Sequence, residues 1–414
     1  MKDFWRRQSR NYKVFLIRDT LGRLGGGRGP PGIEPRGGGE YWSIFMDRLG
    51  ATSIEIGLIR SISSAVNVLL ALPFGWLTDF TEKMKRLYLV GRATFIPVGL
   101  MRFLATTWPF CALIGVWETV SMRLTDPVSQ IISIDSLKDE DRTTGLSLHR
   151  TITSIAGVVA PLISAYVIAY FGGLESADGI RPVFLIQFVL GIITFMLIVT
   201  KMKDVNFKRA KRDASVLGHF FSMFREMPVL KLHLLRRCVM TFIMQLRMPF
   251  NGLYMVDVKG ADEFIVGLRG TASTALIVLL SMLIGQLAER YGRRRVAYFG
   301  RVFGWMSYLV TIFTPLTNPE FLIIAGMLEG LRMVMFIGWQ AFDQELIPLE
   351  RRGRYTGVSM MANGVAGVVA PILGGVIWNV NPDYIWWISL FCDALIVLPL
   401  MILIGYKVSK TMHE

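Results

Sequence analysis

Three carboxylates of this sequence lie in the middle of long apolar segments. They are Glu118, Glu329 and Asp393. A charge in a low-dielectric environment is costly, so a buried carboxyl group takes up a proton more readily than one in water. These acids are therefore candidates for binding protons or substrate. The alternative is that each forms a structural ion pair with a basic side chain on a neighbouring segment.

Basic residues occupy the same kind of segment and are candidates for the same site. Arg123 follows Glu118, and Arg332 lies three residues after Glu329, which places this second pair on one face of a helix. Asp393 has no arginine on its own segment, which favours proton or cation binding.

Four further arginines have different expected roles. Arg236 and Arg247 share one apolar segment and are candidates for binding an anionic substrate. Arg92 and Arg301 lie close to the ends of their segments. We expect them to extend towards the membrane surface or to pair with acids at the segment ends, Asp135 and Glu345.

The sequence lacks the usual signs of an enzyme or a metal site. Its three cysteines lie inside apolar segments, and its four histidines are scattered along the chain. No set of serine, histidine and acid has catalytic spacing, and no ATP-binding motif is present. We therefore predict a non-enzymatic protein with no metal and no cofactor.

The composition is that of an integral membrane protein. Of 414 residues, 52% are hydrophobic and only 18% are charged, with a mean hydropathy of +0.46. Soluble proteins carry about 25% charged residues. The net charge of +14 does not indicate nucleic acid, because Lys and Arg gather in short gaps between apolar segments. That distribution is typical of cytoplasmic membrane loops.

Segments of roughly 20 apolar residues are long enough to cross a bilayer. Eleven are clear, near 54–78, 87–106, 109–133, 147–171, 182–201, 232–256, 264–288, 296–316, 321–345, 356–378 and 384–406. The alternation of basic and acidic loops places both termini in the cytoplasm, which requires an even number of spans. A twelfth span must therefore come from the residues before Leu49.

An internal repeat divides the chain into two similar halves. Residues 51–80 match 261–290 at ten of thirty positions, and AGVVAP occurs at both 156–161 and 366–371, again 210 residues apart. The charged residues repeat at nearly the same offset. We predict an all-α membrane protein with twelve transmembrane helices in two pseudo-symmetric six-helix bundles, residues 1–200 and 229–414, joined by a basic cytoplasmic linker at 201–228.

A loop in the second half resembles the conserved loop of the major facilitator superfamily, Gly-x-x-x-Asp/Glu-Arg-x-Gly-Arg-Arg. The residues that match it are Gly285, Glu289, Arg290, Gly292, Arg293 and Arg294. The first-half copy keeps Gly75 and Asp79 but lacks the second glycine. A second family pattern, an acid followed by an arginine after the fourth span, occurs as Asp135 with Arg142 and as Glu345 with Arg352.

The resemblance covers essentially the whole chain and implies secondary transport by alternating access. In physical terms, the first glycine permits close helix approach, and the acids and arginines form pairs that hold the cytoplasmic side closed. The alternative role of these arginines is to fix the topology by their positive charge alone.

The direction and substrate of transport are less defined by the sequence. The AGVVAP stretches resemble a Gly-Pro motif of exporters in this family, although the fuller copy is in the eleventh span rather than the fifth. We expect proton-coupled export of small, mostly apolar compounds. The alternatives are proton-coupled uptake of a small organic solute, a non-transporting membrane sensor and a lipid-handling enzyme.

The expected partners follow from this interpretation. They are a small-molecule substrate, a proton or another cation and the lipid bilayer, without nucleic acid. The expected form is a monomer in the plasma membrane. One feature conflicts with it: residues 25–39 are rich in glycine and proline and interrupt the first span. Arg18 before the interruption aligns with Arg236 of the second half.

Overall fold

The computed structural model describes residues 5, 8–25, 39–71, 73, 74, 77, 81, 84–137, 142–203, 228–347 and 352–413. Within these ranges the regular elements are helices, and no strand is present. The described chain is therefore all-α, as predicted. Most of the interruption at 25–39 and most of the linker at 201–228 lie outside the described residues.

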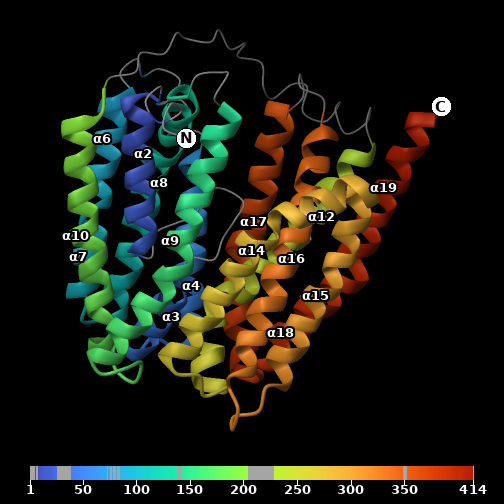
Figure 1. The fold of residues 1–414 in the computed structure, drawn as a ribbon. Helices are drawn as coiled ribbons and strands as arrows, with labels where there is room; N and C mark the ends of the chain where they lie inside the picture. The colour runs from blue at the N-terminus through green and yellow to red at the C-terminus, as the bar shows by residue number, and fades with distance from the viewer. Residues whose placement is uncertain are drawn as a thin grey trace. The chain divides into compact units, whose positions relative to one another are not determined.

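The described helices follow one another along the chain from α2 to α19 (Figure 1). In the first half they are α2 (Arg10–Leu24), α3 (Gly39–Arg48), α4 (Ser53–Leu69), α6 (Met84–Phe95), α7 (Pro97–Leu104), α8 (Trp108–Asp135), α9 (Arg142–Tyr170) and α10 (Ala177–Lys201). In the second half they are α12 (Pro228–Arg247), α13 (Asn251–Leu253), α14 (Glu263–Tyr291), α15 (Arg293–Phe313), α16 (Phe321–Glu345), α17 (Arg352–Val380), α18 (Asp383–Cys392) and α19 (Leu398–His413), with short 3-10 and π segments beside α13 and between α18 and α19.

Twelve spans account for the described helices when continuous neighbours are joined. Helices α2 and α3 are the described parts of the predicted first span, α6 continues into α7, and α18 continues into α19. Seven described segments are long and apolar enough to cross a membrane by length and composition alone. Helices α8, α12 and α16 do not meet that criterion, and they contain most of the predicted intramembrane charges.

Large apolar side chains cover the outside of the helices. Leu279 and Met282 on α14 and Leu395 beside α19 are each about 70% exposed. A soluble protein rarely leaves so much apolar surface in water, whereas lipid tails are as apolar as these side chains. This outer surface is what a lipid-facing helix requires.

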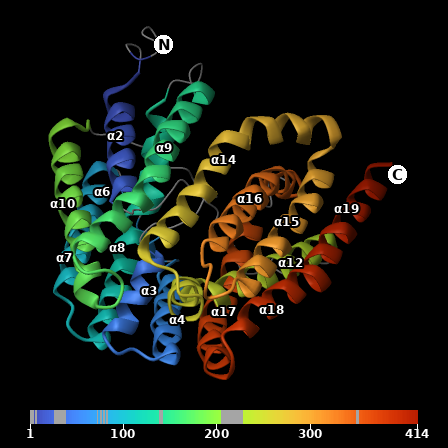
Figure 2. The ribbon, with the colours of Figure 1, turned by 60° about the horizontal axis from the view of Figure 1, so that its bottom comes forward.

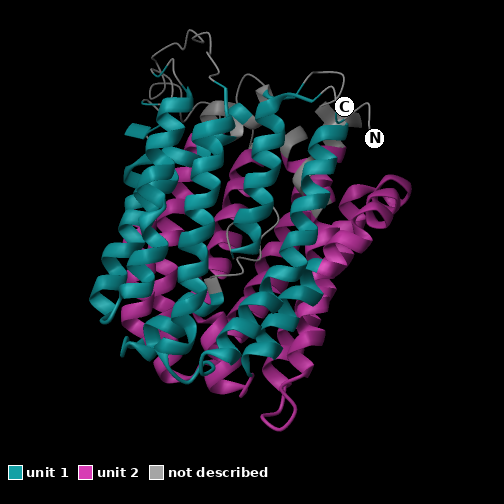
Figure 3. Ribbon diagram, turned by 60° about the vertical axis from the view of Figure 1, so that its left-hand side comes forward, with its two compact units in different colours: residues 1–52, 66–210, 262–274 teal, residues 53–65, 211–261, 275–414 magenta. Residues whose placement is uncertain are grey.

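The described chain forms two compact units that interleave in sequence (Figure 3). The first unit contains residues 1–52, 66–210 and 262–274, and the second contains 53–65, 211–261 and 275–414. Each unit therefore holds the start of one helix from the other half of the sequence. The two exchanged pieces, in α4 and α14, lie at equivalent positions of the 210-residue repeat.

The exchanged piece of α4 packs against the AGVVAP stretch of α17 within the second unit. A Cβ atom added at Gly57 would lie 2.3 Å from the carbonyl oxygen of Pro371. The Ser61 hydroxyl donates a hydrogen bond of 2.6 Å to the carbonyl oxygen of Val368. Proline weakens the helix ladder of the preceding turn, which leaves nearby carbonyl oxygens available to a neighbouring helix.

The first unit repeats this contact with its own residues. A Cβ atom added at Gly267 of α14 would lie 2.9 Å from the carbonyl oxygen of Pro161 on α9. The Thr271 hydroxyl donates a hydrogen bond of 2.8 Å to the carbonyl oxygen of Val158. All four residues are the repeat equivalents of those in the second unit. The AGVVAP stretches are thus sites of close helix packing.

Glycines also bring α15 against α16, which lie side by side in the second unit (Figure 1, Figure 2). A Cβ atom at Gly300 would lie 2.6 Å from Met335 Cβ, and one at Gly304 would lie 2.2 Å from Arg332 Cδ. The absent side chain of Gly304 makes room for the Arg332 side chain. The first unit has a similar contact, in which Gly91 of α6 faces Leu124 and Thr125 of α8.

Candidate functional site

Asp393 forms a buried ion pair with Arg301. Asp393 begins a single π-helical turn, Asp393–Val397, between α18 and α19, and such turns are frequent at functional sites. Its Oδ1 atom lies 2.7 Å from Nη1 of Arg301 on α15, and its Oδ2 atom accepts a 2.8 Å hydrogen bond from Nε1 of Trp305. Only 4% of Asp393 and 2% of Arg301 is exposed.

This pair is a contact that the sequence did not indicate. From the sequence, Asp393 was expected to bind a proton or cation. Arg301 was expected to extend towards the membrane surface or to pair with Glu345, whose side chain lies outside the described residues. The partner of Asp393 is on another helix, one turn of α15 away from Trp305, and sequence spacing does not show such a contact. The sulfur atoms of Met240 and Met401 and the Phe336 ring also surround the Arg301 guanidinium.

Glu329 and Arg332 form a second ion pair on α16, as their spacing predicted. Arg332 Nε donates a 2.8 Å hydrogen bond to Glu329 Oε2, and Arg332 Nη2 lies 2.5 Å from Oε1. Arg247, at the end of α12, approaches the same carboxylate at 3.8 Å and lies over the Tyr308 ring at 4.5 Å. Glu329 is therefore shared between two guanidinium groups.

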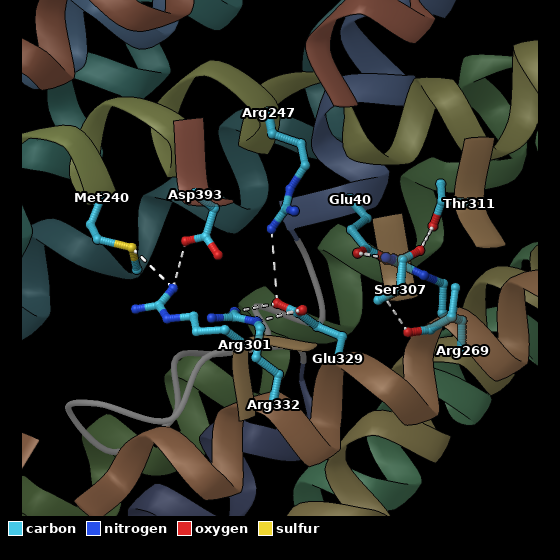
Figure 4. Close-up of polar contacts among 11 residues, drawn as sticks. Glu40, Met240, Arg247, Arg269, Arg301, Ser307, Thr311, Glu329, Arg332 and Asp393 are labelled. Atoms are coloured by element: carbon cyan, nitrogen blue, oxygen red, sulfur yellow. Dashed lines mark hydrogen bonds and ion pairs between the residues drawn. The ribbon is translucent and has the colours of Figure 1, made fainter. Parts of the chain in front are cut away.

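These two groups of charges lie near each other inside the second unit (Figure 4). Arg332 interacts electrostatically with Asp393 and with Arg301. The set contains three guanidinium groups and two carboxylates, so positive charge is in excess. Its side chains come from α12, α15, α16 and the α18–α19 junction, and movement of any one of these helices would change the pairing.

In the first unit, Glu118 pairs with Arg102 rather than with Arg123. Glu118 Oε2 lies 2.6 Å from Nη2 of Arg102, which belongs to α7. The Arg102 guanidinium also lies 4.5 Å from the centre of the Trp42 ring and 5.7 Å from that of Phe184. Arg102 was absent from the predicted site, although it is an arginine within an apolar span.

Arg236 forms a buried ion pair with Asp343. Arg236 Nη2 lies 2.5 Å from Oδ2 of Asp343 on α16, and the other oxygen of that carboxylate lies 2.8 Å from Nε2 of His233. The second ring nitrogen of His233 contacts the Tyr355 hydroxyl on α17. Arg236 and His233 are fully buried. This arrangement joins α12, α16 and α17 and does not favour the predicted role of Arg236 in anion binding.

The conserved loop of the second half is a sharp turn between α14 and α15. Gly292 has φ of +96°, a conformation that residues with a side chain rarely adopt, which explains its place in the motif. Arg294 reaches α19, where Nη1 donates to the carbonyl oxygen of Gly405 at 2.5 Å and to Ser409 Oγ at 3.1 Å. Glu289, Arg290 and Arg293 are exposed.

The expected close approach at Gly285 is not present. A Cβ atom there would meet no described atom within 4 Å. Gly75 and Asp79 lie outside the described residues. Asp135, Arg142, Glu345 and Arg352 lie at the ends of described helices, but their side chains are outside the described part. The gating role of these motifs stays a prediction.

No group of three or more His, Cys, Asp or Glu side chains with the arrangement of a metal site occurs among the described residues. The three cysteines, Cys111, Cys238 and Cys392, are free thiols.

Comparison with known proteins places the chain in a family. The model of the Major Facilitator Superfamily matches residues 41–254 and 237–411. No curated protein is significantly similar in sequence. The chain therefore belongs to the major facilitator superfamily, whose transporter fold its helices adopt.

Solved structures of similar fold are transporters. A mutant of the nucleoside transporter NupG has a TM-score of 0.75 and 16% identity, covering 95% of this chain and 99% of that one. A bacterial homologue of the iron transporter ferroportin has a TM-score of 0.70 and 15% identity, covering 95% and 98%. A peptide transporter, POT, in complex with sulfate has a TM-score of 0.72 and 13% identity, covering 96% and 94%. At these identities the likeness shows the fold alone.

Proposed function

We propose that this protein is a secondary active transporter that moves a small polar solute across the membrane by alternating access, coupled to protons. The observation that supports this most is the set of buried charges in the second unit, Arg247, Arg301, Glu329, Arg332 and Asp393. The family fold provides the framework, and these charges provide the binding chemistry.

Burying a charged side chain costs desolvation free energy, and a stable fold does not require such charges. Apolar residues of similar volume often stabilise a protein as well as a buried ion pair or better. Ionisable groups within membrane spans usually mark a substrate or ion pathway. A chain that holds several pairs within its spans is therefore best explained by a function that uses them.

The excess of guanidinium groups favours a solute with a carboxylate or another anionic acceptor. Arg247 shares Glu329 with Arg332 at the longer distance of 3.8 Å, and its side chain is partly exposed. A ligand carboxylate can accept two parallel hydrogen bonds from one guanidinium. This set of charges supports a polar solute better than the mostly apolar compounds expected from the sequence.

The AGVVAP stretches give no separate support to export. In each unit they form the close contact between two helices described above, which explains their glycine and proline without reference to direction. The transport measurement below distinguishes export from uptake of a small organic solute. The plasma membrane location, cytoplasmic termini and monomeric state belong to the same proposal.

Transport by the purified chain in proteoliposomes tests the function. Radiolabelled uridine, dialanine, glutamate and citrate are suitable probes, with ethidium as an apolar cation. We expect accumulation of one polar probe under an inward proton gradient and its loss when an uncoupler is added. Gradient-driven loss of preloaded ethidium, with no accumulation of a polar probe, would support the export of apolar compounds instead. Binding without flux would support a sensor.

A further inference from the structure

The first unit contains a carboxylate that lies between an imidazole and a guanidinium. Asp19 Oδ2 lies 2.8 Å from Nε2 of His149, and Asp19 Oδ1 accepts a 2.7 Å hydrogen bond from Nε of Arg18. The Tyr88 hydroxyl contacts the same guanidinium. Asp19 and Arg18 belong to α2, His149 to α9 and Tyr88 to α6, so the cluster joins three helices of this unit.

The second unit contains the same four residue types. There Asp343 lies between Arg236 and His233, and Tyr355 completes the set. Arg18 and Arg236 align in the repeat, but the acid and the histidine come from different helices in the two units. The likeness is therefore one of chemistry rather than of aligned positions, and it provides a matched internal comparison.

The two sets differ in access. The side chains of His149 and Asp19 are 14% and 23% exposed, whereas those of His233 and Asp343 are 0% and 16% exposed. A proton can reach an imidazole only along a path that water can enter. The imidazole of His149 is partly exposed, whereas that of His233 is enclosed by its neighbours.

Histidine is the side chain suited to exchanging a proton near neutral pH. Its ordinary pKa of about 6.5 lies within the physiological range, whereas arginine keeps its charge throughout. Glu118 and Asp393, the acids predicted to carry protons, are each paired with an arginine. Asp19 is also paired with an arginine, but its second oxygen faces a group that titrates.

The helices of this cluster carry further charged and polar groups. Arg92 of α6 interacts electrostatically with Arg18, Asp19 and Tyr88 and with Asp126 of α8. Arg23 of α2 lies against Gly157 of α9, and Arg150 follows His149 in α9. Helix α10 carries Asp178, Arg181 and Lys201 in its first and last turns, and Arg269 of α14 pairs with Glu40. Among these groups, Asp19 makes the direct contact with the imidazole.

We propose that the Asp19–His149 pair is a proton-binding site of this protein. The proton adds to Nδ1 of His149, while Nε2–H donates to Asp19 Oδ2. The charged pair then ties α2 to α9 more strongly than the neutral imidazole does. Its role in coupling rests on the proposed transport function, but proton binding itself does not.

Histidine-selective NMR of the full chain in lipid nanodiscs tests proton binding directly. The chain has four histidines, so His149→Gln identifies the signal of His149 by its loss. We expect the chemical shift of this signal to change with pH, and Asp19→Asn to alter that response. A signal that does not respond to pH, or a response that Asp19→Asn leaves unchanged, would overturn the proposal.

His233→Gln is the matched control. The signal of His233 should stay constant as the pH changes, and the His233→Gln variant should lose thermal stability because it breaks the contacts of a fully buried imidazole. Titration of His233 in place of His149 would assign the proton site to the second unit and overturn the proposal.

Flux measurements separate the proton site from the transport function. Using the probe that the wild type accumulates, we expect His149→Gln to lose at least tenfold in gradient-driven accumulation and to keep exchange without a gradient. Wild-type accumulation by a folded His149→Gln variant would overturn the role in coupling. If the wild type moves no probe, the proposed function fails, while the NMR titration still decides the proton site.

Discussion

Several buried charges in the described chain are held as ion pairs, so the effect of removing one residue depends on the charge that remains. Arg301 illustrates this, because its loss leaves Asp393 buried beside Trp305. Breaking a buried pair by removing one partner typically costs about 3–5 kcal/mol. Replacing both partners by apolar residues of similar volume avoids the unpaired charge.

We therefore predict that Arg301→Met alone lowers the free energy of unfolding by about 3–5 kcal/mol, and that adding Asp393→Leu restores part of it. Recovery should be incomplete because Trp305 Nε1 then lacks its acceptor, at a cost of about 1–3 kcal/mol. Denaturation of the solubilised variants measures both values. Equal stability of Arg301→Met and the wild type would show that the pair is not formed.

Glu118→Gln distinguishes a structural acid from a proton carrier. It removes the charge facing Arg102, which keeps its contacts with the Trp42 and Phe184 rings. We expect a loss of stability of about 1–3 kcal/mol and retention of gradient-driven transport. A stable variant that exchanges substrate but no longer responds to a proton gradient would instead identify Glu118 as the carrier.

For single residues, the sequence identified the charged residues within the spans better than it identified their ion-pair partners. Glu329 with Arg332 follows from helical spacing, and the structure contains that pair. The partners of Asp393 and Glu118 lie on other helices, and an apolar span gives no spacing rule for such contacts. Asp19 and His149 were passed over for the same reason.

Two pairs of helices in this protein approach each other closely where glycine faces a proline-containing stretch. Gly57 meets Pro371 in the second unit, and Gly267 meets Pro161 in the first. In both cases the obstacle to a larger residue is backbone, which cannot move aside as a flexible side chain can. These contacts set the separation of α4 from α17 and of α14 from α9.

We predict that Gly57→Ala lowers stability by about 1–3 kcal/mol, because its Cβ would overlap a backbone carbonyl. Gly267→Ala should do so less, since the added atom lies at 2.9 Å instead of 2.3 Å. Gly357 lies at an exposed position of α17, where an added Cβ atom would meet no described atom within 4 Å. Gly357→Ala is therefore the control and should be neutral or stabilising by up to about 1 kcal/mol. Thermal unfolding of the three variants in one detergent measures the order, and equal effects at all three positions would contradict it.

The sequence predicted the membrane spans and the internal repeat. It did not predict that the first residues of α4 and of α14 each pack with the unit of the other half. Apolar length and the 210-residue repeat depend on local composition, which the printed sequence shows directly. The packing of 53–65 with the second unit and of 262–274 with the first depends on which helix faces which, and repeat symmetry allows more than one arrangement. The first span, interrupted at 25–39, is described only as α2 and α3.

For the whole molecule, the distribution of Lys and Arg predicts the orientation in the membrane. Lys203 follows α10 and should face the cytoplasm, whereas Asp262 precedes α14 and should face the outside. An impermeant thiol reagent applied to intact cells should label Asp262→Cys and leave Lys203→Cys unlabelled. The opposite pattern would invert the topology. The three native cysteines should first be replaced so that only the introduced thiol reacts.

The central claim is that the protein carries a small solute across a membrane and that a proton gradient drives this transport. Accumulation of labelled probes in proteoliposomes under an imposed pH gradient is its most direct measurement. The account predicts saturable accumulation of a polar probe, collapse of that accumulation by an uncoupler and its loss in the Arg301→Met, Asp393→Leu double variant. Flux no greater than in protein-free liposomes, from protein that binds the same probe, would contradict it.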